Sequence, residues 1–145
     1  MTSTPETGRV LAIDVGSKRI GLALSDPRRV LASPLETVAA RPRPLALHLI
    51  LGHIEAHAVT RVVFGLPLEL DGTEGRAVRK AREWVEALGA KTDVPLEEFD
   101  ERFSSVAAER ALLEANVSRA GRKEATDRVA AAIFLQAWLD REAAR

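Results

Sequence analysis

The chain has 145 residues, which is enough for one domain with its own hydrophobic core. Hydrophobic residues make up 46% and charged residues 29% of it, as in a globular protein and unlike a disordered chain. The net charge is zero and cysteine is absent. This composition excludes a disulfide scaffold, thiolate metal ligands and a cysteine nucleophile, and its bulk charge does not indicate a nucleic-acid binder.

The first third of the chain predicts three consecutive strands. Apolar runs occupy residues 9–15, 20–25 and 30–38, and short turns separate them. The first run is apolar at odd and even positions alike, which is typical of a strand covered on both faces. We expect residues 1–8 to form a flexible tail. The first seven residues do not resemble a signal peptide, and the longest apolar run, residues 129–135, is too short for a membrane span. We therefore expect a cytoplasmic protein without a membrane partner.

In the rest of the chain, predicted helices alternate with strands. The pattern predicts helices at residues 45–57 and 74–88 and strands at 61–66 and 94–99. A further helix is expected from Ser104 or Ser105 to about residue 115, then a loop at 116–121 and a last helix at 122–141. This order predicts a single α/β domain over residues 1–145. Its mixed five-stranded sheet has three antiparallel strands first and is flanked by helices.

Three acidic positions interrupt these patterns. Asp14 follows an apolar strand, Asp100 and Glu101 end the fifth strand, and Asp127 is in phase with the apolar stripe of the last helix. Each has an ordinary structural explanation: a turn, a solvated loop, or an acid near a helix N-terminus. Together, however, they fit a site for one or two Mg²⁺ or Mn²⁺ ions that assist phosphodiester hydrolysis, because these ions prefer oxygen ligands.

Four motifs in order resemble the YqgF/RuvX family. Asp14-Val15-Gly16-Ser17-Lys18-Arg19-Ile20-Gly21 looks like its opening motif. The later ones are Gly65-Leu66-Pro67 through Asp71-Gly72, Asp100-Glu101-Arg102-Phe103-Ser104, and Asp127 with Ala130-Ala131 and Leu135-Gln136. The resemblance covers about residues 9–140. It implies an RNase H-like fold related to the RuvC resolvase, and a metal-dependent nuclease.

By this resemblance Asp14 is the first-strand carboxylate and Asp127 the carboxylate of the C-terminal helix. The resolvase relatives end their fourth strand with an acid, but this chain has Gly65-Leu66-Pro67 there. The middle role would pass to Glu101 or Asp100, with Glu69 as a fallback. The predicted catalytic residues are therefore Asp14, Asp100, Glu101 and Asp127, and the predicted metal ligands are Asp14, Glu101 and Asp127.

Basic side chains accompany these carboxylates, and we expect them to bind phosphates of a nucleic acid. They are Lys18, Arg19, Arg102, Arg119, Arg122 and Lys123. Aromatic residues make up only 4% of the chain, so a base-stacking platform is not expected, and Trp84 and Trp138 are predicted to lie in the core. His53 and His57 are spaced like a metal pair but are better interpreted as surface histidines.

The function that the resemblance implies is processing of the 5′ end of precursor 16S rRNA. One alternative is a Holliday junction resolvase acting on branched DNA, which would require a homodimer with two facing sites. A second is a binding module in RNA processing or transcription without catalysis, which the missing fourth-strand acid favours. A third is a fragment of an actin-like phosphotransferase, whose phosphate-binding opening Asp14-Val15-Gly16-Ser17 also resembles.

Overall fold

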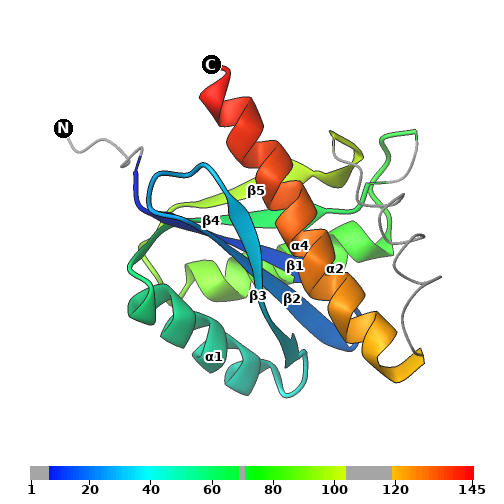
Figure 1. Cartoon of the computed structure of the whole chain (residues 1–145). Coiled ribbons are helices and arrows are strands. Elements are labelled where there is room, and N and C mark those ends of the chain that lie inside the picture. Colours follow the sequence, from blue (N-terminus) through cyan, green and yellow to red (C-terminus); the bar gives the residue numbers. More distant parts are fainter. Residues whose placement is uncertain (1–6, 69–70, 104–118) are drawn as a thin grey trace.

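Figure 1 shows a computed structural model of the chain, which describes the backbone of residues 7–68, 71–103 and 119–145 and their side chains except those of 103 and 119–127. The strands are β1 (Arg9–Val15), β2 (Arg19–Ser25), β3 (Ala32–Ala39), β4 (Val59–Leu66) and β5 (Leu96–Asp100). The helices are α1 (Arg43–Ala56), α2 (Arg76–Gly89), the short 3-10 helix η1 (Glu101–Phe103) and α4 (Arg119–Ala143).

The five strands form one mixed sheet in the order β3-β2-β1-β4-β5. The first three strands pair antiparallel, while β4 pairs parallel to β1 and β5 pairs parallel to β4. This is the predicted arrangement, and β1 lies at its centre. Because β1, β4 and β5 are parallel, their carboxyl ends meet at one edge of the sheet.

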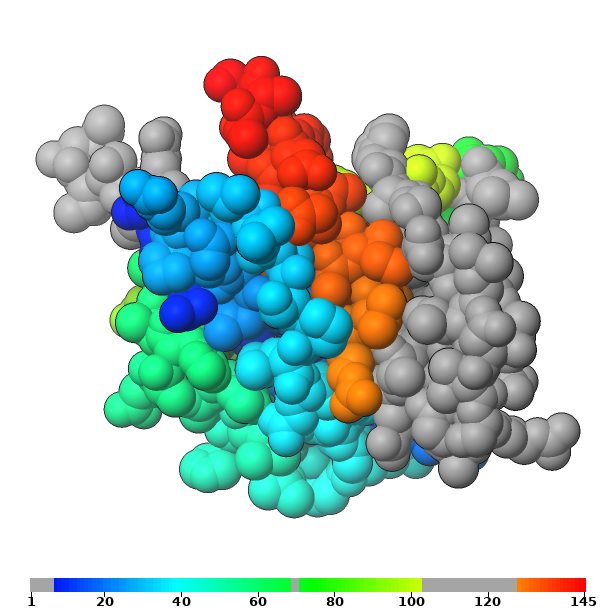
Figure 2. All heavy atoms as spheres, viewed as in Figure 1, coloured from blue at the N-terminus to red at the C-terminus, as the bar shows by residue number. Residues whose placement is uncertain are grey.

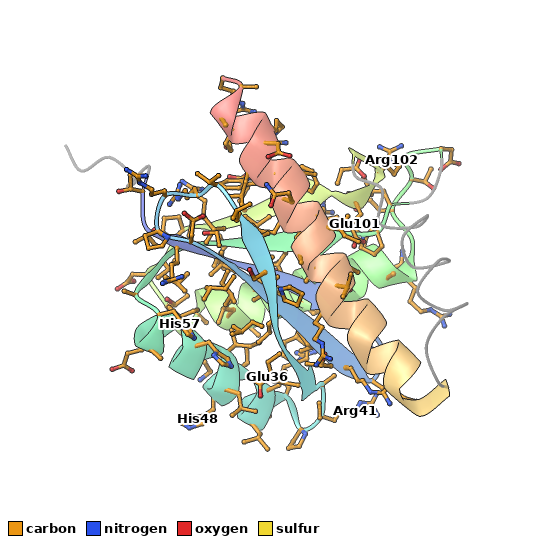
Figure 3. All side chains as sticks on the ribbon, in the orientation of Figure 1. Glu36, Arg41, His48, His57, Glu101 and Arg102 are labelled. Carbon is orange, nitrogen blue, oxygen red and sulfur yellow. The ribbon has the colours of Figure 1, made fainter. Side chains whose placement is uncertain are left out.

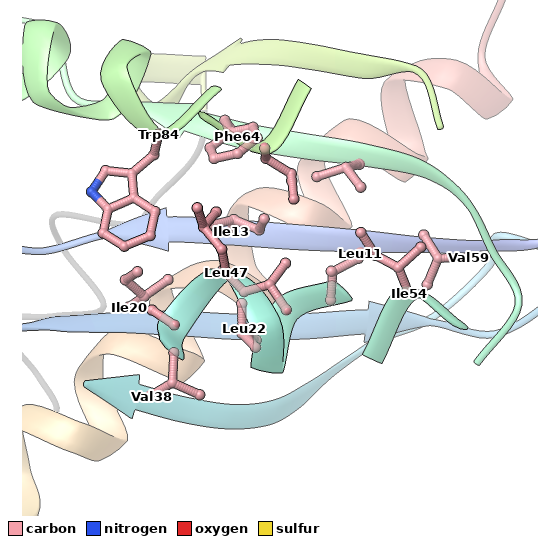
Figure 4. Packing of buried hydrophobic residues seen from close by; sticks show 14 of the residues in the cluster. Leu11, Ile13, Ile20, Leu22, Val38, Leu47, Ile54, Val59, Phe64 and Trp84 are labelled. Carbon is pink, nitrogen blue, oxygen red and sulfur yellow. The ribbon is translucent and has the colours of Figure 1, made fainter. Parts of the chain in front are cut away.

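Helices cover both faces of the sheet. On one face, α1 and α2 enclose the larger core, to which β1 contributes Leu11 and Ile13 (Figure 4). On the other face, α4 packs on Val10 and Ala12, which point the opposite way along the same strand. Figure 2 shows α4, in orange and red, running beside β3 across this face. Burial on both faces explains why β1 has no polar alternation.

Both tryptophans that were predicted to lie in the core are buried. Trp84 of α2 belongs to the larger core, and Trp138 of α4 belongs to the core on the other face of the sheet. None of the helices in the described part of the chain has the length and apolar character needed to cross a membrane.

The edge strand β3 accommodates Pro34 beside a register shift, where Ala23 pairs with Pro34 and Leu22 with Glu36. Proline is tolerated there because an edge strand has unpaired backbone groups.

Several boundaries differ from the sequence prediction. The loop predicted at residues 116–121 is wrong in its last part, because α4 already begins at Arg119 and includes Gly121. Alanine, arginine, lysine and glutamate around this glycine are strong helix formers and outweigh its preference for a loop. The turn η1 after β5 was not predicted. The helix expected from Ser104 or Ser105 lies outside the described residues.

Candidate functional site

Asp14 is the second-last residue of the central strand, β1, which ends at Val15. It is only 5% exposed, and it is the one buried acid among the side chains that the structure describes. Because Val10 and Ala12 face α4, Asp14 two residues later faces the same side. Burial of a carboxylate is costly unless the surroundings compensate its charge, so this position has a stronger reason than turn formation.

The register of the parallel strands places further residues in a row with Asp14. Ile13 pairs with Phe64, and Gly65 pairs with Phe99. The next residues along the two strands, Asp14 and Gly65, therefore lie side by side. Phe99 of β5 lies on the other side of Gly65. Neighbouring strands are about 4.8 Å apart, so the backbones of β1 and β5 are about 10 Å apart here. A long side chain from the end of β5 is needed to reach toward Asp14.

The space beside Asp14 on β4 is filled by an aromatic ring. A Cβ atom added to Gly65 would lie 2.8 Å from Cε2 of Phe134, a fully buried residue of α4. The ring of Phe134 also stacks on that of Phe99, with 6.3 Å between the ring centroids. A fourth-strand carboxylate therefore cannot fit without moving α4, which explains why this chain has no acid at that point.

The two carboxylates that follow Phe99 have different surroundings. Asp100 points away from α4, since Phe99 before it points toward α4. Its carboxylate accepts hydrogen bonds from Nη2 (2.6 Å), Nε (2.9 Å) and the backbone N–H (2.9 Å) of Arg102. The side-chain hydrogen bond from Arg102 holds the pKa of Asp100 below its ordinary value. Asp100 is thus an anionic partner of Arg102.

Glu101 begins η1, which contacts α4. Its side chain is half-buried, and the Oε1 atom is inaccessible to solvent. In Figure 3, Glu101 lies closer to α4, whereas Arg102 lies at the outer rim near the loop that follows β4. The turn of η1 therefore sends the two neighbouring carboxylates, Asp100 and Glu101, to different sides.

Arg102 connects β5 to the loop between β4 and α2. Its guanidinium lies against Gly72, where an added Cβ would come within 3.3 Å of Nη1. The charges of Asp100 and Asp71 both raise the pKa of Arg102, after the larger effect of the hydrogen bonds to Asp100. This placement favours a structural role for Arg102 over the expected phosphate contact.

Asp127 lies within α4, more than two turns after the helix begins at Arg119. Favourable interaction with the helix dipole is confined to the first turn, so it does not explain an acid at this position. The side chain of Asp127, and those of Arg119, Arg122 and Lys123 on the same part of α4, lie outside the described side chains. Glu69 lies outside the described residues altogether.

The turn between β1 and β2 carries the other predicted phosphate contacts. Lys18 is exposed and Arg19 is half-buried. The backbone N–H of Gly16 donates to the carbonyl of Arg19, which closes the turn at 2.8 Å. Nζ of Lys80, on α2, reaches the carbonyl of Ser17 at 3.4 Å. Lys80 is not among the phosphate contacts predicted from the sequence, although the helix pattern places it in the first half of α2.

His53 of α1 and His57, which follows the helix, belong to no cluster of three metal-ligating side chains in the described part of the chain. His53 pairs with Glu36 of β3, and its ring stacks on that of His57 with the centroids 5.7 Å apart.

Comparison with known proteins places this geometry in a family. The model of the RuvX family, described as Holliday junction resolvase, matches residues 8–141. The chain belongs to the RuvX family. This confirms the expected family and the expected class of enzyme, a nuclease, and it favours the nuclease over a phosphotransferase fragment.

Two similar proteins are each named "Putative pre-16S rRNA nuclease". One, from Roseiflexus sp. (strain RS-1), is 46% identical over 135 residues, which cover 93% of this chain and 96% of that protein. The other, from Myxococcus xanthus (strain DK1622), is 43% identical over 132 residues, which cover 91% and 87%.

Two solved structures share the fold of this RuvX-family chain. Thermus thermophilus RuvC in complex with a Holliday junction substrate superposes with a TM-score of 0.59 at 16% identity, covering 94% of this chain and 96% of that one. The yeast mitochondrial Holliday junction resolvase gives 0.57 at 14% identity, covering 98% and 82%. These similarities confirm the predicted RNase H-like fold.

Proposed function

We propose that this RuvX-family protein is a metal-dependent nuclease that processes the 5′ end of precursor 16S rRNA. The observation that carries the proposal is the burial of Asp14 at the end of the central strand, on the same side of the sheet as α4. The names of the similar proteins favour this RNA over a DNA junction as the substrate.

Asp14 and Glu101 supply the oxygen ligands that Mg²⁺ or Mn²⁺ prefers. They approach from the ends of two parallel strands with one strand between them, and the extra methylene of glutamate helps to span that gap. Asp127 is proposed as the third ligand, from α4. A divalent cation bound there would lower the pKa of a water molecule and stabilise the leaving oxygen. Arg102 takes no part in binding it and keeps Asp100 away from the site.

The residues around the carboxylates hold the substrate in place. Lys18, exposed in the turn after β1, is placed to contact a backbone phosphate at this edge of the sheet. Phe134, Phe99 and Gly65 form an apolar floor next to Asp14 and keep bulk water from that side of the carboxylate. Arg19, Arg119, Arg122 and Lys123 remain proposed phosphate contacts.

The proposal is tested by incubating the purified protein with precursor 16S rRNA in Mg²⁺, Mn²⁺ or EDTA. We expect cleavage at the 5′ end that requires the metal. Asp14→Asn and Glu101→Gln are expected to lower kcat by about 100-fold or more, since each removes a charged group from the reacting centre. Asp100→Asn is the matched control. We expect this variant to retain activity within about tenfold of the wild type, because Asp100 affects the site only through its contact with Arg102.

The competing functions give different results in the same assay. Faster cleavage of a four-way DNA junction than of the precursor RNA would identify a resolvase. Binding without cleavage, unchanged by Asp14→Asn, would identify a catalytically silent module. Greater loss with Asp100→Asn than with Glu101→Gln would contradict the assignment of Glu101 as the middle carboxylate.

A further inference from the structure

One face of α2 carries three cations that the activity proposed above does not use. Arg76, Arg79 and Lys80 are three and four positions apart, so they lie together on the helix surface. Arg76 and Arg79 are exposed, and Lys80 is half-buried. The opposite side of the helix is the packed one, with Val78 and Ala81 buried. We call Arg76, Arg79 and Lys80 the cationic strip.

None of the described acidic side chains pairs with a cation of the strip. Within the described part of the chain, neither Arg76 nor Arg79 forms an ion pair, and Lys80 bonds only to a backbone carbonyl. By contrast Arg82, on the same helix, pairs with both Glu74 and Glu98. The first turn of α2 contains no acidic residue. Positive side chains in this half of a helix oppose its dipole, so helix stability does not account for them.

Packing fixes the strip at the edge of the sheet that carries Asp14. Val15, the residue after Asp14, packs against the cluster formed by Leu66, Val78 and Ala81. Nζ of Lys80 reaches the carbonyl of Ser17, next to Lys18. The strip therefore lies along α2 next to the β1–β2 turn, on the opposite face of the sheet from α4. Figure 1 shows α2 beginning at the side where β1 and β4 end.

We infer that the cationic strip binds the phosphodiester backbone of the nucleic-acid substrate at phosphates remote from the cleaved bond. The inference rests on the proposed function for the position of that bond. A strand lying across the sheet edge meets the carboxylates on the α4 side and the strip on the α2 side. Side chains of this kind contact phosphates without distinguishing bases, so the strip supplies affinity and orientation, and base sequence does not matter to it.

The test measures binding without cleavage. Fluorescently labelled precursor RNA is titrated in EDTA with the Asp14→Asn protein and with the same protein carrying Arg76→Ala, Arg79→Ala and Lys80→Ala. Each lost phosphate contact lowers the slope of log K against log salt by about 0.7 on a single strand, so we expect a decrease of about 2. A four-way DNA junction in parallel shows whether the strip serves RNA or DNA.

The matched control also removes three positive charges, but from positions away from the carboxyl ends of β1 and β4. Arg28→Ala, Lys91→Ala and Arg145→Ala change exposed cations near the start of β3, after the end of α2 and at the end of α4. We expect this triple variant to keep the salt slope of the parent. Thermal unfolding of both triple variants checks that they are folded, and Arg76→Lys with Arg79→Lys should restore most of the slope.

Catalysis provides a second measurement that a structural role would not reproduce. With Asp14 intact, the strip variant should raise KM for long RNA and leave kcat unchanged. On a fragment of a few nucleotides around the cleaved bond it should behave like the wild type. An unchanged salt slope in the strip variant would overturn the inference and leave the nuclease intact. If the strip variant has a reduced salt slope but the protein with Asp14 intact cleaves no substrate, the strip binds nucleic acid as inferred and the proposed function is overturned. Absence of binding by the parent would overturn both.

Discussion

At the scale of single residues, Gly65 decides which strand can carry the middle carboxylate. Any side chain at this position would meet the ring of Phe134, which is fully buried and stacks on Phe99 of β5. The absence of an acid on β4 is thus the result of close packing between a strand and α4. In the proposed site a carboxylate from the end of β5 takes this role, at a distance that a glutamate spans better than an aspartate.

Gly65→Ala should therefore lower the free energy of unfolding by about 1–3 kcal/mol, because it overpacks a tight core. Gly52→Ala is the matched control. A Cβ at Gly52, in α1, meets no atom within 4 Å, so alanine there should raise the stability by about 1 kcal/mol through helix propensity. Chemical denaturation measures both changes. Equal effects of the two substitutions would show that the Phe134 contact does not restrict position 65.

At the scale of elements, the Asp100–Arg102 pair organises the end of β5. It closes the turn of η1, which contacts α4, and its guanidinium lies next to Gly72 in the loop after β4. A charged pair at a strand end therefore helps to orient Glu101, the proposed middle carboxylate. Its effect on stability depends on pH, because Asp100 must be ionised for its bonds to Arg102.

Replacement of Asp100 by asparagine should make folding less dependent on pH in acid. The pKa of Asp100 is lowered in the folded state, so its contribution to stability is complete above its unfolded pKa of about 3.9. The contribution is lost as the pH falls through the lower, folded value. The difference in unfolding free energy between wild type and Asp100→Asn should therefore be present at pH 7 and shrink below about pH 4. A difference that stays constant down to pH 2 would contradict this.

At the scale of the whole molecule, Glu97 connects the α4 layer to the sheet, two residues before Phe99 on β5. Its carboxylate accepts hydrogen bonds from Arg61 on β4 and from Trp138 and Arg141 on α4. The guanidinium of Arg141 also lies over the ring of Phe99, 5.1 Å from its centroid. Three elements distant in sequence meet at this one side chain.

Glu97→Gln should lower the free energy of unfolding by about 1–3 kcal/mol, because the amide cannot satisfy three donors that a carboxylate accepts. Glu98→Gln is the control, since among the described residues Glu98 pairs only with Arg82, at the surface, and the substitution should cost at most about 1 kcal/mol. Hydrogen exchange should show faster exchange of α4 amides in the Glu97 variant. Equal protection in the two variants would mean that Glu97 does not hold α4.

The sequence predicted the sheet because its strands are apolar runs and its crossovers are regular. It also indicated Asp14, since a carboxylate in such a run is conspicuous. It could not separate Asp100 from Glu101, because their directions depend on the register of β5 against β4 and on η1. The contact of Phe134 with Gly65 joins residues far apart in the chain, and no local pattern contains it. The start of α4 depended on competing helix propensities around Gly121.

The two edge strands of the sheet resist the addition of another strand. β3 contains Pro34, which has no N–H to donate, next to the register shift in its pairing with β2. β5 has only five residues, and three of them are charged: Glu97, Glu98 and Asp100. Such edges prevent neighbouring molecules from extending the sheet into aggregates. Extension of the sheet from one molecule to the next is therefore disfavoured as a route to self-association.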